Sequence, residues 1–404
     1  MPKPVVLVGT LDTKGAEFWF VRDLLHGRGL EVIVVDFGVL GDPPFDPDVT
    51  NDEVARAGGS SIEQLRAGQD KTWAMRVMER GLAAVVSDLY GSGRLGGILG
   101  MAGGGGTSIA TAAMRQLPVG VPKLMVSSIA SVGDISPYLG TKDITMMPSV
   151  VDVAGLNSIS RRIYANAAGA ITGMVEQAMP EVQEEKPLVT ASMFGNTTPC
   201  VNHAQKVLEG HGYEVLIFHT TGTGGRTMEA LIESGYITAN LDVTATELAD
   251  TICGGVMSAG PDRLLASARA GIPALLAPGC VDMVNFWAIN TVPQEYRDRN
   301  LYEWNPNITL MRTDVEENQK IGQMIADAAN GSTGPVAVLI PLKGVSQLDS
   351  PGGPFWDPEA DQACFAAIRN NLKPDIPLIE VDNNINDPAF AEKAVALLLD
   401  MLKR

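Results

Sequence analysis

The fold of this chain is decided by residues 5–17, which read Val5-Val6-Leu7-Val8-Gly9-Thr10-Leu11-Asp12-Thr13-Lys14-Gly15-Ala16-Glu17. A short apolar run is stopped by Gly9 and Thr10, and a polar turn leads into apolar residues at helical spacing over 16–28. The stretch predicts a strand that enters the N-terminus of a helix. Such a junction offers free backbone amides and the positive end of the helix dipole to an anion. Thr10, Thr13 and Lys14 add side-chain donors.

A second glycine stretch strengthens the case for an anion site over the alternative, a turn that only joins a strand to a helix. A strand predicted over 96–102 runs into a loop before a helix over 109–117, and this loop contains Gly103, Gly104, Gly105, Gly106, Thr107 and Ser108. Successive glycines cost backbone entropy, which a sequence tolerates where a ligand or another backbone approaches closely. Their N–H groups can hold a phosphate. We favour ligand binding over a packing role. Neither junction has Walker A spacing, and GxGxxG is also absent.

Two further strand ends carry polar residues. Asp36 lies at the end of a strand predicted over 31–37, and Ser128 ends a strand predicted over 122–128. Ligands of open parallel sheets lie at the carboxyl ends of the strands, and an acid there often binds a ribose hydroxyl. For Asp36, a solvated strand-end aspartate is the equally good alternative.

The strand and helix pattern starts twice. Residues 179–187 are charged and bounded by prolines, which is typical of a linker, and a new strand is predicted over 188–193. The same residue types also recur at the same spacing in both halves. Leu25, Gly27, Gly29, Glu31 and Val32 of the first half match Leu208, Gly210, Gly212, Glu214 and Val215 of the second. We therefore predict an α/β fold of two tandem Rossmann-like subdomains with mostly parallel sheets, spanning residues 1–180 and 181–404.

Composition excludes several classes of protein. With 30 Lys and Arg against 47 Asp and Glu, the formal charge is −17, so nucleic acid is not an expected partner. The four cysteines form no CxxC pair, which favours reduced thiols in a cytoplasmic protein. No uninterrupted apolar run reaches about 18 residues, so we expect no membrane span.

The second half holds three candidate catalytic residues. Residues 219–229 combine glycines and threonines with His219 and Arg226, which suits an anion clamp beside an acid or base. A structural role for His219 is the alternative. Asp282 and Asn285 are three apart and would share one face if a helix began there. Cys280 is better explained as a buried thiol, and the loop at 342–357 as either a functional loop or a lid.

As a set, the segments 9–15, 103–108, 219–229, 278–285 and 344–357 resemble an uncharacterised bacterial and plant family. This family includes the N-terminal inhibitory region of a tomato protein that confers resistance to tomato mosaic virus. The resemblance implies two Rossmann-like subdomains, a homodimer or higher homo-oligomer, and ATP binding in the first subdomain, with Mg²⁺ as an accompanying ion. Residues 10–15 and 103–108 would contact the nucleotide. Together with the strand ends, the predicted nucleotide site comprises Thr10, Asp12, Thr13, Lys14, Asp36, Gly103, Gly104, Gly105, Gly106, Thr107, Ser108 and Ser128.

Three functions remain open from the sequence. The first is an ATP-binding cytosolic protein, and the second is an enzyme for a phosphorylated or carboxylated metabolite bound in a cleft between the subdomains. The third is a regulatory or scaffold protein whose nucleotide is structural.

Overall fold

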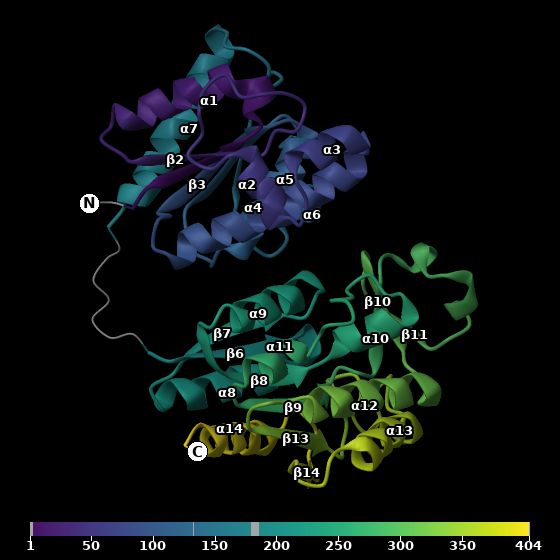
Figure 1. The fold of residues 1–404 in the computed structure, drawn as a ribbon. Helices are drawn as coiled ribbons and strands as arrows, with labels where there is room; N and C mark the ends of the chain where they lie inside the picture. The colour runs from purple at the N-terminus through teal and green to yellow at the C-terminus, as the bar shows by residue number, and fades with distance from the viewer. Residues whose placement is uncertain (1–2, 132, 179–185, 404) are drawn as a thin grey trace. The chain divides into compact units, whose positions relative to one another are not determined.

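The computed structural model describes residues 3–131, 133–178 and 186–403. The chain divides into two compact units, Met1–Glu181 and Val182–Arg404, each with a parallel sheet of its own (Figure 1). The linker predicted at 179–187 lies outside the described residues except for 186–187.

Unit 1 contains a five-stranded sheet in the order β2-β1-β3-β4-β5, and all neighbours are parallel. Its strands are β1 (Val5–Gly9), β2 (Val32–Asp36), β3 (Gly97–Ala102), β4 (Lys123–Ser127) and β5 (Thr145–Pro148). The first four strands are buried along their whole length. Nearly continuous apolar strands are expected where helices cover both faces of a sheet.

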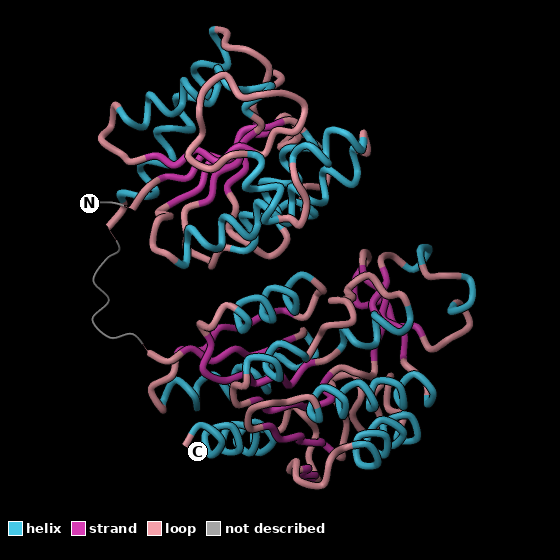
Figure 2. The backbone as a smooth tube through the Cα atoms, viewed as in Figure 1, coloured by secondary structure: helices cyan, strands magenta, loops and turns pink. Residues whose placement is uncertain are grey.

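Helices cover both faces of this sheet. On one face, α1 (Leu11–His26) and α7 (Ser158–Glu176) pack against one set of alternate strand residues, which includes Val5 and Leu7. On the other face, α2 (Asn51–Ala57), α3 (Ile62–Gly68), α4 (Lys71–Gly91) and α5 (Gly104–Gln116) pack against the set that includes Val6 and Val8. A short helix, α6 (Ser136–Leu139), precedes β5. Figure 2 shows this helix, strand and helix layering.

Two helices begin earlier than the sequence predicts. Helix α1 starts at Leu11 rather than residue 16, and α5 starts at Gly104 rather than residue 109. The sequence predicts turns in both places, because 11–15 is rich in polar residues and 104–108 is rich in glycine. The backbone at Lys14 is non-helical (φ −134°, ψ 20°), so α1 has a kink where the turn was predicted. Helices α3 and α4 are separate, because Gln69 has φ +48° and Asp70 caps α4.

Unit 2 contains a six-stranded parallel sheet in the order β14-β13-β9-β8-β6-β7. Its strands are β6 (Leu188–Met193), β7 (Glu214–His219), β8 (Ile237–Thr244), β9 (Ala274–Gly279), β13 (Val336–Pro341) and β14 (Leu378–Val381). One face packs on α8 (Thr198–Gly210) and α14 (Pro388–Leu402). The other packs on α10 (Thr246–Cys253), α12 (Val315–Asn330) and α13 (Pro358–Asn371), while α9 (Thr223–Glu233) and α11 (Leu265–Ala270) pack beside β6 and β7.

A small antiparallel sheet, which the sequence analysis did not predict, is inserted between β9 and α12. Its order is β10-β12-β11, formed by β10 (Met283–Phe286), β11 (Leu301–Asn305) and β12 (Ile308–Arg312). Because β10 begins at Met283, the helix that would have set Asp282 and Asn285 on one face does not form. The short helices η1 (Gly195–Thr197), η2 (Ile289–Thr291) and η3 (Gln294–Tyr296) complete this unit.

The two parallel sheets are wound in the same way. When the strands of each sheet are numbered in chain order, the spatial order is 2-1-3-4-5 in unit 1 and 2-1-3-4-5-6 in unit 2. This confirms the predicted fold of two tandem Rossmann-like units with mostly parallel sheets. In both sheets the winding reverses between the first and third strands, and open α/β sheets bind ligands outside the carboxyl ends of strands at such a point. Across the described residues, no helix has both the length and the apolar character needed to span a membrane.

Candidate functional site

A cavity of about 860 Å³ lies at the reversal point of the unit 1 sheet. Thr10 follows β1, Gly103 follows β3, and both line this cavity. Its other lining residues are Lys14, Phe37, Val39, Leu40, Leu65, Arg66, Gln69, Asp70, Lys71, Ala74, Met75, Met78, Ala102, Gly104, Gly105, Gly106, Ile109 and Asp152. The two glycine-bearing junctions that the sequence singled out therefore face one common space.

The N-terminus of α5 supplies unpaired donors to this cavity. The first amides of an α-helix have no acceptor within the helix. Among the described residues, no acceptor is found for the N–H groups of Gly104, Gly105 and Gly106, whereas the amide of Thr107 bonds to the carbonyl oxygen of Gly103 at 2.9 Å. An added Cβ at Gly104 or Gly105 would meet only side chains, at 3.5 Å or more. These glycines thus leave room for a ligand beside their own backbone donors.

The cationic side chains of the cavity differ in what they contact. Lys14 donates its ammonium to the carbonyl oxygen of Val153, close to the cavity residue Asp152. Arg66 donates to the carbonyl oxygens of Val39 and Gly41 at 2.9 and 2.6 Å, so its guanidinium holds a loop in place. Lys14 and the exposed Lys71 thus line the cavity together with the amides of α5, and two carboxylates, Asp70 and Asp152, line it as well.

The remaining wall of the cavity is largely apolar. Phe37 and Leu65 are buried in the core beneath it, as is Met78, and Met75 lies 3.5 Å from the position a Cβ would take on Gly105. Anion donors and an apolar wall in one cavity suit a ligand with a phosphate at one end and a flat apolar group at the other.

The structure places some of the predicted nucleotide contacts elsewhere. Thr10, Lys14, Gly103, Gly104, Gly105 and Gly106 line the cavity, whereas Asp12, Thr13, Asp36, Thr107, Ser108 and Ser128 do not. Their roles as contacts remain predictions.

Asp36 is fully buried, and its Oδ1 accepts the amides of Leu11 and Gly38, both at 2.9 Å. Burial raises the pKa of Asp36 to about 6, although the two amides oppose this shift. Asp36 therefore holds the start of α1, and its carboxylate is buried in this structure. The Oδ2 of Asp12 similarly accepts the amides of Leu40 and Gly41, at 2.7 and 3.1 Å.

The hydroxyl groups of the predicted site bond mainly to the protein itself. The Oγ1 atoms of Thr10 and Thr13 lie 2.9 Å apart, and the Thr107 hydroxyl donates to the carbonyl oxygen of Gly103. Thr107 Oγ1 also lies 2.7 Å from Ser127 Oγ. These contacts fix the two junctions and leave the backbone amides as the donors for a ligand.

Sequence reasoning missed the wall formed by the 39–40 loop, α3 and the start of α4. The pattern at 60–81 predicts a helix, but nothing in it indicates that Ala74 and Met75 face a cavity. Leu40 and Arg66 lie on separate segments, and only the tertiary fold brings them together.

The three catalytic candidates of unit 2 are not gathered at one point. His219 ends the edge strand β7 and is exposed, whereas Asp282 follows β9 and is fully buried. Two strands, β8 and β6, lie between β9 and β7, so these strand ends are about 14 Å apart. Arg226 is exposed on α9 and donates to the carbonyl oxygen of Ser258 at 3.2 Å.

The predicted anion clamp at the start of α9 already binds a carboxylate of the protein. Glu247 Oε1 accepts the amides of Gly222 and Gly225 at 2.7 and 3.2 Å, and it is fully buried. Arg263 Nε donates to the other oxygen at 2.6 Å and forms a bidentate pair with Asp242. Burial raises the pKa of Glu247, and Arg263 opposes the shift. An external anion would have to displace this carboxylate, so the geometry gives no support to a clamp here.

Asp282 belongs to a buried polar network that shapes the 342–357 loop. It accepts the hydroxyl of Ser346 at 2.8 Å, and that hydroxyl oxygen accepts the amides of Leu348 and Asp349. The pKa of Asp282 is raised, because burial and the neighbouring Asp349 disfavour its charged form. The charge of Arg312 opposes this shift without reversing it. In this structure the contacts of Asp282 are those of a residue that organises a loop.

The reversal point of the unit 2 sheet is closed. Thr244, at the end of β8, and Thr197, after β6, bond through their hydroxyls at 2.8 Å. The first turn of α10, from Thr246 to Leu248, is fully buried. The strand ends that correspond to those at the unit 1 cavity are therefore buried in unit 2.

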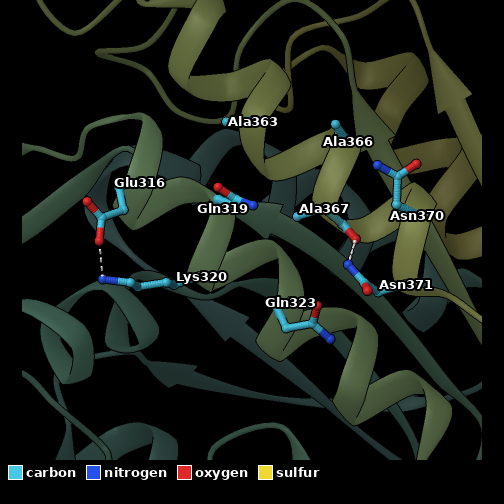
Figure 3. Close-up of a pocket in the computed structure, with 9 residues that line it drawn as sticks. All are labelled: Glu316, Gln319, Lys320, Gln323, Ala363, Ala366, Ala367, Asn370 and Asn371. Carbon is cyan, nitrogen blue, oxygen red and sulfur yellow. Dashed lines mark hydrogen bonds and ion pairs between the residues drawn. The ribbon is translucent and has the colours of Figure 1, made fainter.

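A smaller groove of about 510 Å³ lies between α12 and α13 (Figure 3). Its lining consists of alanines and of polar side chains such as Gln319, Gln323 and Asn370. Glu316 and Lys320 at its edge form an ion pair with each other at 2.7 Å. The two charged residues of its lining are therefore paired with each other. Across the described residues, no group of three or more His, Cys, Asp or Glu is arranged to hold a metal ion.

Two family models together match almost all of the chain. A model described as "Uncharacterised protein family (UPF0261) N-terminal domain" matches residues 3–180, and one described as the C-terminal domain of the same family matches residues 186–402. A UPF0261 protein of Clostridium tetani is 50% identical over 405 residues and is covered completely, as is this chain. The ToMV resistance protein Tm-1(GCR237) of Solanum lycopersicum is 40% identical over 81% of this chain, which corresponds to 44% of the tomato protein.

Among solved structures, the UDP-N-acetylglucosamine 2-epimerase of Rickettsia bellii aligns over 100% of this chain and 97% of its own. The TM-score is 0.24 and the identity 11%, so this likeness supports no argument.

Proposed function

We propose that this chain, which belongs to the uncharacterised protein family UPF0261, is a nucleotide-binding protein whose binding site is the cavity of unit 1. One observation carries this proposal: the free amides of Gly104, Gly105 and Gly106 and a largely apolar wall line one cavity at the reversal point of the sheet. The phosphates would bind at the N-terminus of α5, and the base would pack on the apolar wall.

ATP is the nucleotide that we propose to test, following the family resemblance. Its phosphates need cations and amides, because the protein as a whole carries a formal charge of −17 and would otherwise repel them. Lys14 and Lys71 line the same cavity as these amides and provide positive charge there. Asp152, an exposed carboxylate of the lining, would supply one ligand to a Mg²⁺ ion that arrives with the nucleotide, since Mg²⁺ is often held by one or two carboxylates and substrate phosphates.

Cytoplasmic location and a homo-oligomeric state stay part of this proposal. All four cysteines are free and buried, which suits a reducing compartment.

Isothermal titration of the full chain with ATP and Mg²⁺ tests the proposal. We expect binding that is lost or strongly weakened by Lys14→Ala, because this change removes a cation of the cavity. The matched control is Lys320→Ala on α12, whose ion pair with Glu316 is exposed and lies in unit 2. No heat and no rise in melting temperature with millimolar ATP, ADP or AMP would refute nucleotide binding.

A further inference from the structure

Leu40 is the most exposed large apolar side chain among the described residues, with 85% of its surface accessible, and it lines the unit 1 cavity. Isolated exposed leucines are common on proteins and need no explanation. Leu40 differs because its backbone is fixed from both sides while its side chain stays in water.

Asp12 holds one side of this segment. Its Oδ2 accepts the amide of Leu40 at 2.7 Å and that of Gly41 at 3.1 Å. Gly38, just before, leaves room for this carboxylate, because a Cβ there would lie 2.6 Å from the Asp12 carboxyl carbon.

Arg66 holds the other side. Its Nε donates to the carbonyl oxygen of Val39 at 2.9 Å, and its Nη2 donates to that of Gly41 at 2.6 Å. Its Nη1 pairs with Asp42 at 3.1 Å. The two residues that flank Leu40 are therefore bonded to α3, while Leu40 itself is bonded to α1.

We propose that Leu40 is a ligand-contact residue, which covers one face of the nucleobase when a nucleotide binds with its phosphates on α5. This inference rests on the proposed function. An apolar side chain on a backbone that is already held in place needs no ordering of its loop on binding, and it gains contact when a flat ring excludes water from it. Asp12 and Arg66 then act as positioning residues for Leu40.

The test compares Leu40→Ser with wild type in the full chain, using ATP and inorganic tripolyphosphate as the two probes. Burial of a leucine side chain against a ring predicts that Leu40→Ser raises the Kd for ATP about tenfold. The Kd for tripolyphosphate, which has no base, should not change. The melting temperature of the free protein should also stay the same, because this side chain is solvated before binding. Leu40→Met, which preserves apolar volume, should restore ATP affinity.

Ile159→Ser is the matched control, because Ile159 is 50% exposed in the same unit and does not line the cavity. It should leave both affinities unchanged. If Leu40→Ser binds ATP as tightly as wild type, the role of Leu40 is refuted and the nucleotide site stands. The role is refuted in the same way if wild type binds tripolyphosphate as tightly as ATP. If wild type binds neither probe, the proposed function itself fails.

Discussion

Asp36 in unit 1 and Glu247 in unit 2 each accept backbone amides at the start of a helix, Asp36 at Leu11 of α1 and Glu247 at Gly222 and Gly225 of α9. Both carboxylates are fully buried. In unit 1 this arrangement occupies the first amide of α1 and leaves those of α5 for a ligand. In unit 2 it occupies the glycine-rich junction that the sequence marked as an anion clamp.

The buried carboxyl of Asp36 gives unit 1 a defined dependence of stability on pH. Its pKa is raised from 3.8 to about 6 by burial, so the folded state binds the proton more tightly than the unfolded state does. The stabilisation is complete below about pH 4 and is lost as the pH rises to about 6, by about 3 kcal/mol at most. Urea denaturation of the full chain at several pH values measures this change.

Asp36→Asn should remove this part of the pH dependence, because the amide oxygen still accepts both backbone N–H groups and the side chain no longer titrates. Asp23→Asn is the control, since Asp23 is an exposed carboxylate on the same unit. If Asp36→Asn and wild type lose the same stability between pH 4 and pH 6, folding does not raise the pKa of Asp36.

Residues of the candidate site could be predicted from the sequence where backbone amides, and not side chains, would bind the ligand. Four successive glycines predict that amides are accessible whatever the tertiary fold, and Gly103 to Gly106 do line the cavity. The carboxylates were harder to assign, because a strand-end aspartate looks the same whether it faces ribose or a buried amide. Only the positions of Leu11 and Gly38 decide between these cases for Asp36.

At the scale of elements, the glycines of α5 combine poor helix propensity with access to the cavity. Gly105→Ala should raise the stability of the free protein by about 0.5–1 kcal/mol, because alanine is the better helix former and an added Cβ would meet Met75 at no less than 3.5 Å. The same methyl group enters the space where a phosphate would approach the amide. ATP affinity, measured by titration, should therefore fall at least tenfold while the melting temperature rises.

Gly173→Ala on α7 is the control, because it changes helix propensity at a position away from the cavity. Gly173 is exposed, and nothing lies within 4 Å of an added Cβ. It should raise stability and leave ATP affinity unchanged. A Gly105→Ala protein that binds ATP normally would show that no ligand approaches the start of α5.

The elements of the parallel sheets were largely predictable, since buried strands such as β1 and β13 are short apolar runs with glycine or proline at their ends. The antiparallel insertion was not. Strand β10 is only four residues long, and β11 is mostly exposed, so neither has the alternating pattern that marks a strand. The helix N-termini were misplaced because Asp12 and Gly104 have low intrinsic helix propensity, which tertiary contacts override.

At the scale of the whole molecule, the two units share one strand order but differ in whether the reversal point of the sheet is accessible. The reversal point of unit 1 opens into a cavity of about 860 Å³. That of unit 2 is closed by the hydroxyl pair of Thr197 and Thr244, and the start of α9 is occupied by Glu247. The repeated fold could be predicted from glycines and apolar residues that recur at the same spacing in both halves. This match cannot show which of the two units has space for a ligand.

This difference predicts one nucleotide per chain. In calorimetry of the full chain, saturating ATP should raise the unfolding transition of unit 1 and leave that of unit 2 in place, because a ligand stabilises only the fold that binds it. At a free ATP concentration of about 1,000 times the Kd, the stabilisation of unit 1 should be about 4 kcal/mol. Titration should give a stoichiometry of one ATP per chain. Two ATP per chain, or an equal shift of both transitions, would contradict this assignment. Hydrogen exchange locates the effect independently: bound ATP should slow exchange at 103–107, whereas the amides of Gly222 and Gly225 should exchange at the same rate with and without ATP, because Glu247 already accepts both of them.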